Sequence, residues 1–350
     1  MNEQQVQKES RTKPVLAIVQ PEVSVGCDDG HFGIKVCTDD WRQIYVPSRV
    51  SLGSQLISLD GSDDNCYESG GESYTVSNSI ATIDTRFQDY PLSDVNRVLV
   101  SHALIKAGLG GQNVRLVTGL PVQDYYVGSA RNTAFIDRKV KNLLDGSVTN
   151  RNPNVVCAKI VAHLVVSEGI AAFYDLLIDK EGNINSALAD QVASGSIAVL
   201  DIGGKTTDSA VIVNGGKGIE ANRSGTAYLG GLSLNTAVEP RLKAKLKVDS
   251  LSTRQIEDAV AKGVLRAFGS EHDVSEIILD EKKALAHQII SECKRKMRDA
   301  ADLEAVYFVG GGSLLLQAQL QDLFPHAVFV EDPQFANARG MLKFAKFILG

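Results

Sequence analysis

Apolar residues recur along this chain with two different spacings, and each change of spacing marks a new element. Residues 22–28 and 33–38 are short β-type runs separated by an Asp-Asp-Gly turn sequence. A helix is expected from Ser93 or Asp94, because apolar residues then repeat every three or four positions up to Gly108. The pattern also predicts a strand at 114–118, a helix at 128–144, a strand at 155–166 and a short helix at 169–178.

Two segments of the first half have a different character. The chain is polar over residues 1–13, which predicts a disordered tail, and apolar over 15–19, which predicts an added edge strand or a subunit contact. Glycine, serine, aspartate and asparagine cluster in residues 60–75, which indicates an exposed hairpin loop.

A second cycle of strands and helices begins near Gly195. Strands followed by helices, in two rounds, predict an α/β protein with two similar lobes. The expected strands are 196–202, 208–213, 218–222, 304–309 and 327–330, and the expected helices are 230–246, 253–266, 281–300, 312–323 and 334–348.

Both lobes open with the same arrangement of strand, aspartate, glycine turn and strand. Residues 25–30 contain Asp28 and lead into the strand that carries Lys35, and residues 199–204 contain Asp201 and lead into the strand after Thr206 and Thr207. The exposed N–H groups of such turns can cradle phosphate oxygens, and an aspartate at the strand end offers hard oxygen ligands to Mg²⁺. A single Asp-Gly hairpin of this kind also occurs simply because it suits the turn.

A third glycine turn comes late, where the apolar run 307–309 is followed by Gly310, Gly311 and Gly312. Glycine lets a purine or a phosphate approach the backbone closely, although glycines at such a junction also serve close packing. The spacing does not match a dinucleotide fingerprint. The sequence Gly204-Lys205-Thr206 is not a Walker A loop either, since Val199 stands where that motif needs its first glycine.

Glu168 comes after the predicted strand that ends at residue 166 and before a short predicted helix, at the carboxyl end of a sheet, where ligand clefts form. A carboxylate there can orient and polarise a water that attacks a phosphate. The alternative is a helix N-terminal glutamate that interacts favourably with the helix dipole.

Composition narrows the class of protein. Of 350 residues, 44% are hydrophobic, and 36 basic against 42 acidic side chains give a net charge of −6, so no direct DNA binding is expected. No uninterrupted apolar stretch is long enough for a membrane helix, so no membrane partner is expected. Five widely spaced cysteines fit a reducing cytoplasm, where we expect the protein to act.

Taken together, these motifs resemble the actin-like ATPase superfamily, and within it the ParM/StbA group of plasmid-segregation proteins. The resemblance rests on residues 28–30 with 34–35, 93–96, 119–121, 167–168 and 201–206, together with 229–230 and 310–312, and it covers nearly all of residues 22–345 in order. It implies an actin-like fold of two RNase H-like lobes around a nucleotide cleft. The implied boundaries are 14–180 for lobe I, 181–332 for lobe II and 333–350 for a helix that returns to lobe I.

The resemblance also implies a function. The protein would form filaments with ATP, hydrolyse ATP with Mg²⁺ in the filament, and segregate plasmids through a centromere-binding adaptor of the ParR type. Glu168 and Asp201 would be catalytic, and Asp28 and Asp201 would bind the metal. The implied nucleotide-binding residues are Asp29, Gly30, Lys35, Gly203, Gly204, Thr206, Gly230, Gly231, Gly310, Gly311 and Gly312.

This chain departs from the family pattern in its first turn. His31 and Phe32 replace small hydroxyl-bearing residues, and Lys205 stands where a threonine is common. A small-molecule kinase on the same fold is the alternative function. It would need a further acidic base and an acceptor pocket, and no convincing second acidic motif is visible in the sequence.

Overall fold

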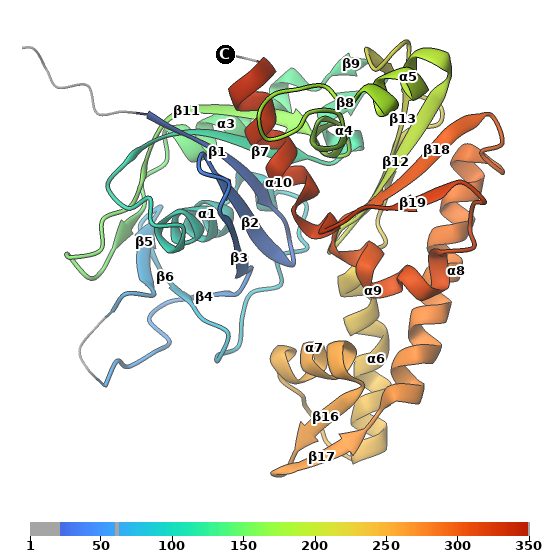
Figure 1. The fold of residues 1–350 in the computed structure, drawn as a ribbon. Coiled ribbons are helices and arrows are strands. Elements are labelled where there is room, and N and C mark those ends of the chain that lie inside the picture. Colours follow the sequence, from blue (N-terminus) through green and yellow to red (C-terminus); the bar gives the residue numbers. More distant parts are fainter. Residues whose placement is uncertain (1–21, 60–62, 349–350) are drawn as a thin grey trace, which may run out of the picture.

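The computed structural model describes residues 22–59 and 63–348, so the segments 1–13 and 15–19 discussed above lie outside the described residues. The first lobe is built on a five-stranded sheet in the order β11-β7-β1-β2-β3 (Figure 1). Strands β1, β2 and β3 form an antiparallel meander, and β7 and β11 continue the sheet in parallel. The bounds are β1 (Glu22–Asp29), β2 (Gly33–Thr38), β3 (Gln43–Pro47), β7 (Asn113–Leu120) and β11 (Lys159–Ser167).

The expected helices of this lobe are present. Helix α1 (Asp94–Lys106) begins after Ser93, whose side-chain oxygen accepts a hydrogen bond from the N–H of Asn96. Helix α3 (Thr133–Leu144) covers part of the predicted 128–144, and α4 (Ile170–Leu177) follows β11. The short elements between β7 and α3 are α2 (Val122–Tyr125), β8 (Tyr126–Val127) and β9 (Ala130–Arg131), and η1 (Tyr90–Leu92) precedes α1.

The hairpin predicted within residues 60–75 is present, but its second half consists of paired strands with buried side chains and is not an exposed loop. Strands β5 (Cys66–Ser69) and β6 (Glu72–Val76) pair antiparallel there, and the side chain of Tyr67 is buried. Their turn is Gly70-Gly71, where both residues have positive φ. With β4 (Val50–Leu52) and β10 (Thr149–Asn150) they form a small four-stranded sheet.

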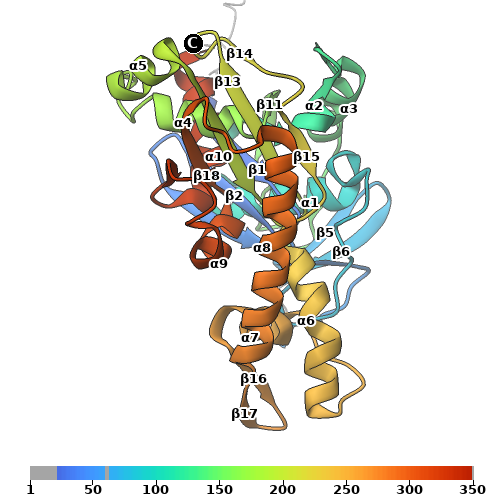
Figure 2. The same ribbon diagram turned by 90° about the vertical axis from the view of Figure 1, so that its right-hand side faces the viewer.

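The second lobe repeats the first arrangement. Strand β12 (Ser196–Ile202) pairs antiparallel with β13 (Thr207–Val213) and parallel with β18 (Leu303–Val309). The sheet is completed by β14 (Gly218–Ile219), β15 (Gly225–Ala227) and β19 (Ala327–Phe329), and α5 (Ser186–Ser194) packs near β12. Figure 2 shows the long helix α8 standing beside this sheet.

A helical extension continues from the second lobe (Figures 1 and 2). It contains α6 (Gly231–Leu246), α7 (Thr253–Lys262) and α8 (Ser275–Met297), with a hairpin of β16 (Val264–Ala267) and β17 (Ser270–Asp273) at its end. The predicted helix 253–266 therefore ends earlier, because Gly263 takes the left-handed conformation. The predicted helix 281–300 begins six residues earlier, at Ser275, and ends at Met297, before Arg298 with its positive φ.

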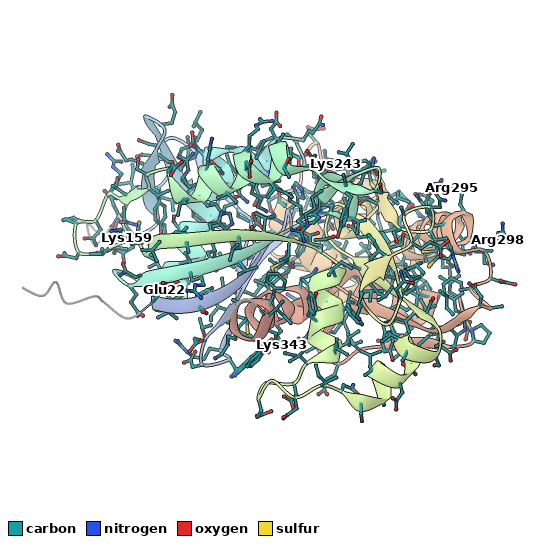
Figure 3. The ribbon with its side chains drawn as sticks, turned by 90° about the horizontal axis from the view of Figure 1, so that it is seen from above. Glu22, Lys159, Lys243, Arg295, Arg298 and Lys343 are labelled. Atoms are coloured by element: carbon teal, nitrogen blue, oxygen red, sulfur yellow. The ribbon has the colours of Figure 1, made fainter. Side chains whose placement is uncertain are left out.

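The chain returns to the first lobe at its end. Helix α9 (Gly311–Leu320) and η2 (Pro333–Phe335) lead into α10 (Ala336–Lys343) and η3 (Phe344–Ile348). Helix α10 packs on β1, where a Cβ at Gly26 would collide with the carbonyl oxygen of Ala338. Seen from above, Lys343 lies between Glu22 and Lys159 at one end of the molecule and Arg295 and Arg298 at the other (Figure 3).

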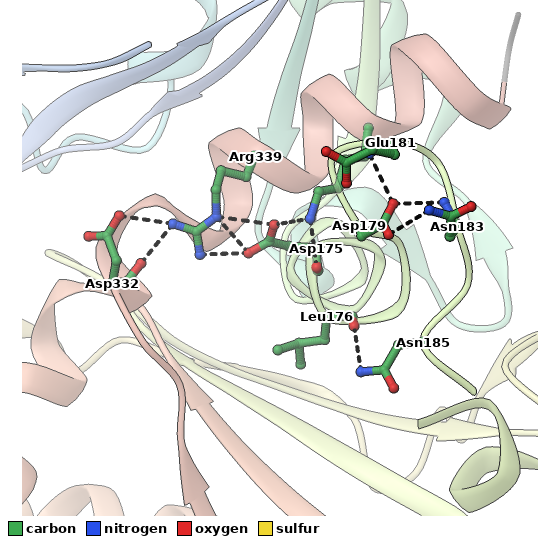
Figure 4. A network of polar contacts seen from close by, with 9 residues as sticks. Asp175, Leu176, Asp179, Glu181, Asn183, Asn185, Asp332 and Arg339 are labelled. Atoms are coloured by element: carbon green, nitrogen blue, oxygen red, sulfur yellow. Dashed lines mark hydrogen bonds and ion pairs between the residues drawn. The ribbon is translucent and has the colours of Figure 1, made fainter. Parts of the chain in front are cut away.

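Ion pairs of Arg339 and Lys343 stabilise the position of helix α10. Arg339 lies between Asp332 and Asp175, with Nε–Oδ2 and Nη2–Oδ2 distances to Asp175 of 2.9 and 2.6 Å (Figure 4). Lys343 also pairs with Asp175, at 2.6 Å. These contacts connect α10 to α4, which carries Asp175, and to the segment after β19, which carries Asp332. Within the described ranges, no helix is long and apolar enough to cross a membrane.

Candidate functional site

The two Asp-Gly hairpins occupy equivalent positions in their sheets. In the first, Asp28 stands opposite Lys35 across the strand pair, and in the second, Asp201 stands opposite Asp208. The second turn is closed by a hydrogen bond from the N–H of Gly203 to the carbonyl oxygen of Thr206, at 2.8 Å. The two hairpins therefore share the aspartate and differ in the residue opposite it, which is a cation in one lobe and an acid in the other.

The fold brings both hairpins to a single cavity of about 50 Å³. A Cβ at Gly204 would lie 2.7 Å from the Cβ of Phe32, so the two turns are in contact. The cavity is lined by most of the residues expected from sequence, which are Asp28, Asp29, Gly30, Lys35, Glu168, Asp201, Gly203, Gly204, Thr206, Gly310 and Gly311.

Lys35 and Asp28 form an ion pair at the floor of this cavity. The distance between Nζ and Oδ2 is 3.0 Å, and both side chains are almost completely buried. Burial works against the charged lysine, but the charge of Asp28, its hydrogen bond to Lys35 and the charges of Tyr45 and Asp201 together outweigh burial, so the pKa of Lys35 is raised. Lys35 therefore stays cationic beside the cavity.

Asp201 is held by a residue that the sequence did not reveal. The Nδ2 of Asn337, on α10, donates to Oδ2 of Asp201 at 2.5 Å. Burial, followed by the charges of Asp208 and Asp28, raises the pKa of Asp201 to about 7. Burial likewise raises the pKa of Asp208 to about 6.

Glu168 lies at the carboxyl end of β11, as expected. Its side chain has room only because residue 119 is glycine, since a Cβ there would lie 2.7 Å from Cγ of Glu168. Burial, then the charges of Asp28, Asp208 and Asp201, raise the pKa of Glu168 well above its usual range.

Lys139 on α3 is a further site residue that sequence reasoning missed. Its side chain is 2% exposed, lines the cavity and pairs with Asp29 at 2.9 Å. It also donates to the carbonyl oxygen of Gly119. The other oxygen of Asp29 accepts from Nδ2 of Asn96 at 2.8 Å. Each oxygen of the Asp29 carboxylate thus accepts a hydrogen bond from a protein side chain. The sequence did not indicate that Lys139 would be one of these partners, because a lysine in a polar helix is usually exposed.

Two of the second-turn residues differ in role. Thr206 lines the cavity, whereas the hydroxyl of Thr207 donates to the carbonyl oxygen of Leu229 at 2.8 Å and supports the next loop. Gly230 packs against the carbonyl oxygens of Gly203 and Gly204 and starts α6.

A second pocket of about 210 Å³ adjoins the first and shares Lys35, Gly203, Gly204 and Gly311 with it. Its walls combine apolar side chains with a few polar ones, and Gly231 and Gly312 complete them. The Nδ2 atom of Asn235 is buried here and has no hydrogen-bond partner among residues 22–59 and 63–348. The remaining lining residues are Phe32, Tyr45, Glu257, Val260, Ala261, Leu315 and Gln334.

These residues fit a magnesium nucleotide. Five acidic side chains, Asp28, Asp29, Glu168, Asp201 and Asp208, lie in or beside the cavity, against the three lysines that line it, Lys35, Lys139 and Lys205. Carboxylate oxygens are hard ligands, and their number in this cavity exceeds that of the lysines, so the site suits a divalent cation. No group of three or more histidine, cysteine, aspartate or glutamate side chains among the described residues could hold a metal. A magnesium ion would therefore use few protein ligands and rely on phosphate and water oxygens, as Mg²⁺ usually does.

Two segments of the chain match two different protein families. Residues 23–178 match the N-terminal family of the plasmid segregation protein ParM, and residues 199–322 match the C-terminal family of archaeal MreB-like actin homologues. No curated protein matches this sequence.

Solved structures with the same fold include ParM proteins and archaeal actins. A ParM in a 15-stranded filament from Clostridium botulinum is 21% identical with a TM-score of 0.74, covering 93% of this chain and 99% of that one. An archaeal actin homologue in complex with ADP is also 21% identical, with a TM-score of 0.73 and the same coverage. The actin-like protein Alp7A is 14% identical, with a TM-score of 0.73, covering 93% of this chain and 96% of that one. The expected actin-like fold of two lobes is confirmed.

Proposed function

Since this chain belongs to the ParM and actin-like family, we propose that it is an ATPase that forms filaments and segregates plasmid DNA. The observation that carries the proposal is the convergence of Asp28, Glu168 and Asp201 on one cavity between two glycine hairpins. An ADP complex of one structural relative and the filament of another support nucleotide binding and assembly.

The two cavities divide the nucleotide between them. The phosphates lie between the hairpin turns, where the backbone of Gly30, Gly203 and Gly204 faces the cavity. The nucleoside lies in the neighbouring pocket beside Gly231, Gly311 and Gly312. Gly310 has a positive φ, and a Cβ there would collide with Asp201, so this turn requires glycine.

Hydrolysis relies on the acidic groups. Asp28 and Asp201 would hold the Mg²⁺, which offsets phosphate charge when bound. Glu168 orients and polarises the attacking water, a role for which its raised pKa makes it a stronger base once ionised. Lys35 and Lys139 supply positive charge to the same cavity.

Segregation adds two partners. Copies of this chain form the filament, and an adaptor of the ParR type links it to plasmid DNA, which fits a chain with a net charge of −6 and no need to bind DNA itself. The lobes follow the boundaries 14–180 and 181–332, with 333–350 returning to lobe I.

Sedimentation with Mg-ATP, Mg-ADP or no nucleotide tests the proposal, together with electron microscopy of the pellets and an assay of released phosphate. We expect filaments with Mg-ATP, and Glu168→Gln should slow phosphate release by about 10²–10⁴-fold while leaving assembly intact. Glu239→Gln, on the outer surface of α6, is the matched control. Phosphate transfer to a sugar without pelleting would instead support the kinase alternative.

A further inference from the structure

One ion pair, whose two contacting atoms are buried, crosses from the first lobe to the second. Arg49 precedes β4 in the first lobe, Glu257 lies on α7 in the second, and their side chains are 9% and 23% exposed. Neither Nη2 of Arg49 nor Oε1 of Glu257 has a hydrogen-bond partner elsewhere among the described residues. The two atoms therefore depend on each other for charge compensation.

Arg49 is attached to the first hairpin turn. The Cζ of Arg49 lies 5.6 Å from the ring centroid of Phe32, and its Nη1 donates to the carbonyl oxygen of Ser48. Ser48 in turn donates from Oγ to the carbonyl oxygen of Gly30 at 2.7 Å, and its N–H donates to the carbonyl oxygen of Phe32. Movement of the first turn is thus transmitted directly to Arg49.

The pair lies where two cavities meet. Glu257 lines the 210 Å³ pocket and also a larger outer cavity of about 680 Å³, which Arg49 lines as well. The outer cavity has walls from both lobes, residues 78–82 on one side and 251–254 on the other. The Arg49–Glu257 pair accordingly forms part of the partition between the inner pocket and the outside.

The cavity between the turns is small, about 50 Å³, and the two turns are in contact through Phe32 and Gly204. A triphosphate does not fit unless the turns separate, so the lobes must open and close around the ligand. The contact from Nη1 of Arg86 to Oγ1 of Thr236, at 2.8 Å, also joins the lobes, but it is exposed, and exposed contacts contribute little. Breaking a buried pair leaves an uncompensated charge and has a large effect.

We propose that the Arg49–Glu257 pair is a gate between the lobes that must break for the nucleotide to leave, and so sets its rate of release. The inference rests on the proposed function, because it assumes that the adjoining pocket holds a nucleotide. Phe32 and Arg49 couple the gate to the first phosphate turn, so that the contents of the phosphate cavity bias whether the gate is closed.

The experiment is a charge exchange. Dissociation of a fluorescent ADP analogue is followed by stopped flow, at protein concentrations that keep the chain unassembled, for wild type, Arg49→Glu, Glu257→Arg and the double exchange. Each single variant should release the analogue about 10-fold to 100-fold faster, and the double exchange should restore most of the slow release. Glu257→Gln gives a milder test if a charge-reversed variant fails to fold, and Arg86→Ala is the control for an exposed contact between the lobes.

A second measurement tests the Arg49–Glu257 contact without any nucleotide present. Amide hydrogen exchange of the nucleotide-free protein should be faster in residues 30–33 and at Gly204 in Arg49→Glu than in wild type, and slow again in the double exchange. Release rates that are equal in all four proteins, or a double exchange as fast as the single variants, would overturn the gate. Absence of analogue binding to wild type would instead remove the proposed function, and hydrogen exchange would still decide whether the pair holds the lobes together.

Discussion

The side chain of Asn337 joins Asp201 to the turn that carries Glu168. Its Nδ2 donates to Oδ2 of Asp201 at 2.5 Å, and its Oδ1 accepts from the N–H of Gly169 at 3.3 Å. One amide on the returning helix α10 therefore fixes an acid of the second lobe relative to an acid of the first.

Replacing this amide should impair turnover more than stability. Asn337→Ala removes a hydrogen bond to a carboxylate and frees the Glu168 turn, so kcat/KM for ATP hydrolysis should fall about 10-fold to 100-fold. Steady-state phosphate release measures the effect. Asn185→Ala, which removes the N-cap of α5 far from the cavity, should lower stability without changing kcat/KM. Unchanged turnover in Asn337→Ala would show that the amide does not position the acids.

The buried pair of Lys139 and Asp29 should be a stability determinant. Lys139→Met leaves the carboxylate of Asp29 buried without its counter-charge, and we expect the free energy of unfolding to fall by about 3–5 kcal/mol. Adding Asp29→Asn should recover much of that loss. Lys262→Met removes the exposed pair with Asp258 and should cost less than about 1 kcal/mol. Urea unfolding compares the four proteins, and equal losses for the two lysines would contradict the argument.

Acid should destabilise the protein partly through His102. Its ring is buried and in hydrogen-bond contact with the hydroxyl of Tyr67 at 2.7 Å, and burial lowers the pKa of His102 to about 4. The unfolded chain takes up a proton near pH 6.5, whereas the folded chain does so only near pH 4. The neutral ring therefore contributes stability above pH 6.5, and this is lost as the pH falls to 4, at about 1.4 kcal/mol per pH unit.

His102→Gln should remove that part of the pH dependence. The raised pKa values of Asp201 and Asp208 act in the opposite direction, so the difference between variant and wild type is the informative quantity. Unfolding free energies at pH 5 and pH 7 give this difference, with His287→Gln on an exposed helix surface as the matched control. A variant whose pH dependence equals that of wild type would show that His102 does not titrate as described.

The unpaired Nδ2 of Asn235 predicts a contact with the nucleoside. Asn235→Ala removes a donor that has no partner within the described part of the chain, so the nucleotide-free protein should keep its melting temperature. Nucleotide binding should weaken by about 5-fold to 30-fold, because the donor no longer meets a ligand oxygen or nitrogen. Isothermal titration calorimetry measures this, with Asn222→Ala, an exposed residue, for comparison. A lower melting temperature with unchanged affinity would assign Asn235 to folding instead.

The sequence predicted most of the helices and strands and their order along the chain. Alternating apolar runs indicated the two β-hairpins, and a serine cap followed by helical spacing indicated α1, because these signals lie within a few neighbouring residues. The hairpin β16–β17 was missed, since a single glycine, Gly263, only interrupts a helical pattern in the sequence, whereas in the structure its left-handed conformation ends α7.

By itself, the sequence determined which residues stand at the two glycine turns and at the end of β11, because strand, turn and aspartate are local in the chain. Only the tertiary structure decided their partners. Lys139, Asn337 and the Arg49–Glu257 pair come from segments distant in sequence, 110 residues apart for Lys139 and Asp29, and such charges gain their importance from burial and proximity. Neither burial nor proximity can be predicted from the local spacing of residues, because both arise only when the lobes close and exclude water from the acids between them.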